Sequence, residues 1–71
     1  MAMPTMKRFD HWALVNAMQD QGMDAEDLAE EIGCSIDAVA RWMAGIAEPK
    51  TGYAHQAARA LDVDLETLYT K

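Results

Sequence analysis

The stretch "DAEDLAEEIGCSIDAVARWMAG", which runs from Asp24 to Gly45, decides the fold of this 71-residue chain. Apolar residues recur at helical spacing on both sides of Gly33, which predicts two short amphipathic helices. Gly33 permits a left-handed turn between them, and Gly45 is a typical residue for ending the second helix. The stretch therefore predicts helices at about residues 25–32 and 36–44, joined by a tight turn.

The sequence on either side of this stretch predicts three further helices and no strand. The expected elements are a first helix from about Phe9 to Gln21, a fourth capped by Thr51, and a last turn or two capped by Asp64. No alternating apolar pattern of strand length is present. We therefore expect an all-α fold, a compact five-helix domain over residues 9–71, after a flexible tail at residues 1–8.

A single cysteine and the lack of a long apolar run indicate the cellular setting of the chain. Cys34 has no second cysteine with which to form an internal disulfide, whereas small secreted domains usually need several. The N-terminal residues do not contain the apolar segment of a signal peptide. These features predict a cytoplasmic protein with no membrane contact.

Four motifs in a fixed order carry a resemblance to a known family. They are "LAEEIG" (28–33), "V-x-R-W-x-x-G" (39–45), "EP" (48–49) and "ALDVDLETL" (60–68). In this order, over more than four-fifths of the chain, the sequence resembles the lambda-repressor-like helix-turn-helix family, also called Cro-type or XRE-type. The resemblance implies a repressor-like transcriptional regulator that binds DNA as a homodimer, with its third helix in the major groove.

The resemblance also implies a set of DNA contacts in the third helix and in the loop that follows it. These candidate residues are Ser35, Ile36, Asp37, Arg41, Lys50, Thr51 and Tyr53. Arg41 and Asp37 are expected at base edges, and Lys50 and Thr51 at phosphates. No cofactor and no metal is implied.

The chain departs from the family at three positions where polar residues are usual. Ala25, Ile36 and Ala38 occupy these positions. Ile36 can pack on a thymine methyl group, which is a weak form of base recognition, or it can lie at a protein interface. These departures leave Arg41 as the main candidate for sequence recognition.

Arg41 and Asp37 each have two interpretations. Arg41 can donate to guanine, the commonest specific contact, or it can pair with Asp37 one helical turn away. Asp37 can accept a hydrogen bond from cytosine N4, or it can be only an acid in the positive first turn of a helix. The sequence leaves both pairs of alternatives open.

The candidate backbone contacts also have structural alternatives. Ser35 and Thr51 are suited to capping helices as well as to phosphate contact. Tyr53 can be a half-buried ring instead of a phosphate ligand. Lys7 and Arg8 can form an arm along the duplex or belong to a tail without contacts.

The net charge of −6 is unusual for a DNA-binding domain, because phosphate contacts normally require a basic surface. Six acids and no base lie between Asp20 and Glu31. Between Gly33 and Tyr53 two acids and two bases balance. The acidity is therefore concentrated on the second helix, and the expected DNA-binding segment is neutral. This distribution predicts few phosphate contacts and weak binding by one subunit.

Two other classes of function compete with DNA binding. A protein-interaction module on the same scaffold is indicated by apolar residues at positions expected to be exposed, namely Ile36, Met43 and Ile46. The candidates for a homodimer surface are Trp12, Leu68 and Tyr69. An enzyme is not indicated, because His11 and His55 are isolated residues, each expected on the surface of its helix, and Cys34 has no base near it in the sequence.

Overall fold

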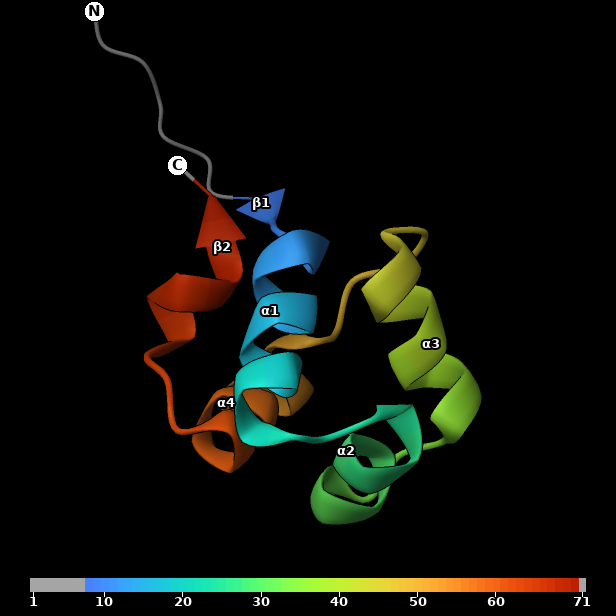
Figure 1. Cartoon of the computed structure of the whole chain (residues 1–71). Coiled ribbons are helices and arrows are strands. Elements are labelled where there is room, and N and C mark those ends of the chain that lie inside the picture. The colour runs from blue at the N-terminus through green and yellow to red at the C-terminus, as the bar shows by residue number, and fades with distance from the viewer. Residues whose placement is uncertain (1–7, 71) are drawn as a thin grey trace, which may run out of the picture.

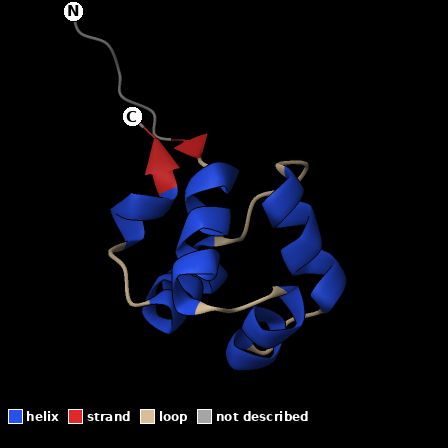
Figure 2. Cartoon of the chain, viewed as in Figure 1, coloured by secondary structure: helices blue, strands red, loops and turns tan. Residues whose placement is uncertain are grey.

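The computed structural model describes residues 8–70, which form four α-helices, one 3₁₀ turn and two very short strands (Figures 1 and 2). The elements are β1 (Arg8–Phe9), α1 (His11–Gln21), α2 (Ala25–Ile32), α3 (Ile36–Ala44), α4 (Thr51–Leu61), η1 (Leu65–Leu68) and β2 (Tyr69–Thr70). The compact all-helical domain is confirmed. The count of five helices is wrong by one, because the last element is a 3₁₀ turn.

The two strands join the ends of the described chain, and the expectation of no strand is wrong. β1 pairs antiparallel with β2, with Phe9 opposite Tyr69 and Arg8 opposite Thr70. The rings of Phe9 and Tyr69 meet edge to face, with centroids 5.8 Å apart. Of the predicted tail at residues 1–8, only Arg8 lies within the described residues, and it belongs to this ribbon.

The first helix begins two residues later than the sequence predicts, at His11 instead of Phe9. Asp10 is extended, and its carboxylate accepts hydrogen bonds from the amides of Trp12 (3.0 Å) and Ala13 (3.3 Å). An aspartate cap of this kind satisfies amides that have no partner inside the helix. Phe9 is thereby left to pair in the ribbon.

The predicted unit of two helices and a turn is confirmed. Asp24 and Asp27 form a reciprocal capping box at the start of α2. Gly33 adopts the left-handed conformation, with φ of 76°, and its amide bonds the carbonyl of Ala29 at 2.8 Å. Ser35 then caps α3, because its hydroxyl oxygen accepts from the amide of Ala38 at 3.1 Å.

The end of α3 is held against α1. Gly45 ends the helix in the left-handed conformation, as the sequence predicts. His11, expected on the surface, is instead half-buried, and its Nδ1 donates to the carbonyl of Met43 at 3.1 Å. This bond satisfies a carbonyl of the last turn, which has no partner inside the helix. The imidazole thus fixes the C-terminal end of α3 to the start of α1.

The core lies between the helices, and every helix contributes to it. Its largest fully buried side chains are Leu14, Met18, Leu28, Val39, Leu61 and Leu68. Leu68 therefore belongs to the core, and its assignment to a dimer surface is wrong. No helix among the described residues has the length and apolar character needed to cross a lipid bilayer.

The start of α4 differs from the prediction. Lys50 is the cap residue and Thr51 is the first residue of the helix, so Thr51 does not cap it. The side chain of Lys50 makes no cap hydrogen bond, so the first amides of α4 have no side-chain cap. Asp64 precedes η1 as expected, but its side chain makes no cap hydrogen bond either.

The contact between Gly45 and His11 gives a stability prediction. Both Gly22 and Gly45 have positive φ, so alanine at either position is strained by about 1–2 kcal/mol. A Cβ at Gly45 would lie 2.7 Å from His11 Cδ2, whereas a Cβ at Gly22 meets nothing within 4 Å. We expect Gly45→Ala to lower the free energy of unfolding by a further ~1–3 kcal/mol relative to Gly22→Ala, measured by urea denaturation. Equal losses in the two variants would contradict this packing.

Candidate nucleic-acid interface

One side of α3 forms a continuous exposed stripe. Its residues are Ile36, Asp37, Ala40, Arg41 and Ala44, which recur at the spacing of one helix face. Val39 and Trp42 are buried on the opposite side. Figure 1 shows α3 at the edge of the molecule, with no other described helix over its outer side. We call these five residues the α3 stripe.

Two charged side chains of the α3 stripe form an ion pair. Arg41 Nε lies 3.0 Å from Asp37 Oδ2, and the side chains remain 59% and 73% exposed, respectively. An exposed pair at this helical spacing contributes only ~0.3–0.5 kcal/mol to stability. The pairing that the sequence allowed is therefore present, and the guanidinium remains accessible to a ligand that approaches the stripe.

The remaining residues at the start of α3 have mainly structural contacts. Ser35 is the helix cap, and its hydroxyl proton is still available to a phosphate. Ala38 and Ala25, which replace polar residues of the family, both pack partly against the core. Ile36 is 51% exposed. The stripe therefore presents one large apolar side chain beside the ion pair.

The start of α4 gathers the candidate phosphate ligands. Lys50, Thr51 and Tyr53 are all exposed there, and Lys50 and Tyr53 line one shallow hollow. The ring centroid of Tyr53 lies 5.9 Å from that of Trp42, which is buried. Trp42 thus braces Tyr53 at the start of α4. The uncapped amides and Lys50 form a surface that is suited to an anion.

Acidic residues are concentrated on α2. Glu26, Asp27, Glu30 and Glu31 are all exposed on this helix. Asp27 and Asp24 belong to the capping box, so their carboxylates have a structural role at the start of α2. The two charges on the α3 stripe cancel, so the acidity of the chain does not lie on that surface.

A second apolar surface adjoins the C-terminal end of α3. Trp12 is 65% exposed, and its ring centroid lies 4.9 Å from that of His11. Ile46 is 74% exposed and follows Gly45, where an added Cβ would lie 2.7 Å from Cδ2 of the same imidazole. We call Trp12, His11 and Ile46 the Trp12 patch. The carboxylate of Asp10, which accepts from the amide of Trp12 at 3.0 Å, adjoins it.

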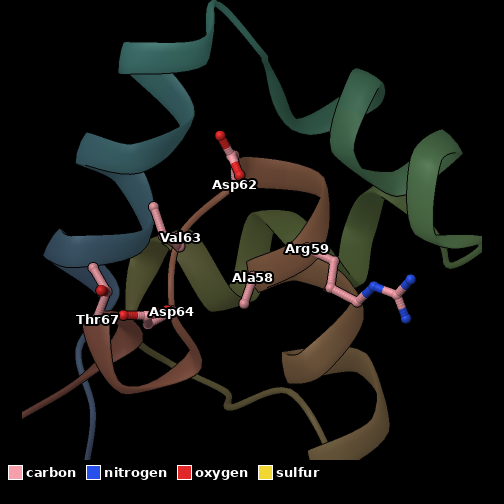
Figure 3. Close-up of a pocket in the computed structure, with 6 residues that line it drawn as sticks. All are labelled: Ala58, Arg59, Asp62, Val63, Asp64 and Thr67. Atoms are coloured by element: carbon pink, nitrogen blue, oxygen red, sulfur yellow. The ribbon is translucent and has the colours of Figure 1, made fainter.

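A pocket on another part of the surface does not offer a recognisable chemical site. It lies between the end of α4 and η1 and is lined by Ala58, Arg59, Asp62, Val63, Asp64 and Thr67 (Figure 3). Within residues 8–70, no group of three or more His, Cys, Asp or Glu side chains is arranged to hold a metal. Burial raises the pKa of the Cys34 thiol, which disfavours the reactive thiolate.

Sequence reasoning did not identify the role of His11. The hydrogen bond to Met43 spans 32 positions of the chain, and no local pattern indicates such a partner. The cap at Asp10 did have a signal, because aspartate directly before an amphipathic run is a common start of a helix. His55 is exposed on α4, as predicted.

Comparison with known proteins agrees with this geometry. A family model described as helix-turn-helix matches residues 14–68. No curated protein matches the chain. The fold is similar to the crystal structure of a transcriptional regulator from Listeria innocua, with a TM-score of 0.76 and 19% sequence identity. The match covers 90% of this chain and 59% of the Listeria chain.

Proposed function

We propose that this chain, which belongs to the XRE-type helix-turn-helix family, binds double-stranded DNA and regulates transcription as a repressor-like protein. The observation that carries the proposal is the α3 stripe, an exposed helix face next to a helix-turn-helix turn. Its solved neighbour from Listeria innocua is described as a transcriptional regulator. No catalytic step is needed for this role.

The proposed complex places α3 in the major groove and α2 across the backbone, which is the usual geometry of this motif. Arg41 then lies at a guanine, with Asp37 beside it, and Ile36 packs on a thymine methyl group. Ser35, Lys50, Thr51 and Tyr53 lie at phosphates on either side of the groove. The uncapped amides of α4 add a partial positive charge at that position.

Charge limits the affinity of one subunit. Lys50 is the one full positive charge among the proposed phosphate ligands, and the exposed acids of α2 repel the backbone. Two subunits on a symmetric site double the number of contacts, and linkage of the two raises the effective affinity. We therefore propose a homodimer as the DNA-binding form.

The Trp12 patch is the surface that best suits contact between two copies. Each copy carries a net charge of −6, so association between copies has to come from apolar contact and not from charge attraction. Trp12 and Ile46 together expose apolar area that water otherwise covers. Tyr69, another sequence candidate, is half-buried in the ribbon against Phe9 and offers less surface.

A protein-interaction module is the second candidate, and the exposure of Ile36 and Ile46 favours it. Met43 is half-buried near the same end of α3 and can add a flexible apolar contact. In this case the apolar residues of α3 and its following turn contact a protein, and DNA binding is weak or absent. A DNA titration separates the two candidates.

Fluorescence anisotropy with random and upstream-region duplexes, across a salt series, tests the proposal. We expect log K to fall with log salt, with a slope of about −0.9 per phosphate contacted and hence a shallow slope overall. Lys50→Ala removes one phosphate contact and should reduce the slope by about 1. Arg59→Ala, which removes the same charge at the other end of α4, should leave the slope nearly unchanged.

Two outcomes of this titration would count against the proposal. Absence of binding at low salt would leave the protein-interaction module as the better candidate. Equal loss of slope in both variants would show that Lys50 contributes only to the overall field and not to a specific contact.

The dimer surface is tested by equilibrium sedimentation. Trp12→Ser and Ile46→Ser remove apolar area from the Trp12 patch, so we expect each to shift wild-type dimer towards monomer. Ile36→Ser, which removes a half-exposed apolar side chain from the α3 stripe instead, should leave association unchanged. A wild-type monomer at high micromolar concentration would contradict the proposed dimer.

A further inference from the structure

The ion pair on the α3 stripe is formed through the Nε of the Arg41 guanidinium. Asp37 Oδ2 bonds to Nε, at 3.0 Å. A guanidinium carries five N–H donors in one rigid plane, one on Nε and four on the two terminal nitrogens. A bidentate contact with guanine needs two donors directed at O6 and N7. The terminal nitrogens can supply both, so pairing with Asp37 and contact with guanine do not compete.

From this geometry we infer that Asp37 is a positioning residue, which holds the Arg41 guanidinium so that its terminal nitrogens meet a guanine in the major groove. The inference rests on the proposed DNA binding and specifies what the site recognises. Without Asp37, the long arginine side chain is free to rotate and must be ordered when DNA binds. With Asp37, the guanidinium is already held in part before DNA binds, so less conformational entropy is lost on binding.

The surroundings of the pair support this role. Ala40 and Ala44 flank Arg41 on the α3 stripe, and their small side chains leave room for the groove edge to approach the guanidinium. The larger Ile36 lies at the start of the stripe, beside Asp37. Arg41 is the one basic side chain on the α3 stripe, so guanine recognition there depends on its placement. Asp37 is largely exposed, and pairing with Arg41 cancels a charge that would otherwise repel phosphate.

The pair is also placed to act on binding more than on folding. Both side chains are mostly exposed in the unbound protein, where water weakens their attraction. When DNA excludes that water, the attraction between the two charges strengthens. The contribution of Asp37 should therefore appear in base discrimination, while thermal unfolding of the variants stays close to that of the wild type.

Selection from randomised duplexes, followed by anisotropy on the selected site, tests the inference. We expect wild type to select a guanine that Arg41→Ala no longer selects. Asp37→Ala should lose preference for that same guanine. Replacing this guanine by 7-deazaguanine, which lacks the N7 acceptor, should then have little effect on the affinity of the variant. For the wild type the same replacement should weaken binding roughly tenfold, as expected for loss of part of a bidentate contact.

Three further variants sharpen the result. Asp37→Asn keeps an oxygen acceptor for Nε and should restore part of the guanine preference. The variant with both Asp37→Ala and Arg41→Ala should be no less selective than Arg41→Ala alone, because the two substitutions remove the same contact with guanine. Glu30→Ala removes an equal charge from α2 and should leave base preference unchanged.

Other outcomes overturn the inference. If Asp37→Ala binds all duplexes more tightly with an unchanged base preference, Asp37 only repels phosphate. If it loses preference at a different base pair, Asp37 contacts a base directly, as a cytosine N4 acceptor does. If wild type binds no duplex at low salt, the proposed function itself fails together with the inference. If wild type binds DNA and Asp37→Ala keeps the affinity and guanine preference of wild type, the proposed function stands and the positioning role of Asp37 does not.

Discussion

The carbonyl of Ala29 accepts hydrogen bonds from the amides of both Gly33 (2.8 Å) and Cys34 (3.0 Å), and the placement of α3 depends on this turn. The turn requires positive φ at Gly33, which a residue with a side chain adopts only with strain. Because the chain changes direction within so few residues, α3 runs across α2 instead of continuing its course (Figure 1). One side of α3 then packs on the core, and the other side remains open.

A second restraint acts at the other end of α3. The imidazole of His11 donates to Met43 and packs against Gly45, so α1 holds the end of the helix that the turn does not control. Trp42 adds a third contact by bracing Tyr53 at the start of α4. A helix fixed at both ends presents its exposed residues in a constant orientation, which a surface that recognises a rigid duplex requires.

Residues with local causes could be predicted from the sequence, and residues with distant partners could not. The capping box at Asp24, the turn at Gly33 and the cap at Ser35 all follow from preferences within a few positions. The β1–β2 ribbon could not be predicted, because each strand has two residues and no alternating pattern, and the pairing joins Phe9 to Tyr69. The same applies to His11, whose partner lies across the domain.

The start of α4 shows how packing outweighs a local preference. Threonine is the better cap residue, by a margin on the order of 1 kcal/mol over residues without a suitable side chain, yet Lys50 occupies the cap position. Pro49 is buried and Tyr53 contacts Trp42, so the loop and the helix are anchored on both sides of Lys50. For Asp37 and Arg41 the spacing was equally consistent with an ion pair and with base contact. Because the ion pair is formed through Nε of Arg41, the terminal nitrogens stay available for a base, and the two interpretations are compatible. A stripe with two opposite charges provides little attraction for phosphate but can hold one guanidinium in place. In the proposed complex, selectivity and affinity therefore come from different parts of the molecule, the first from α3 and the second from the start of α4 and the proposed second copy.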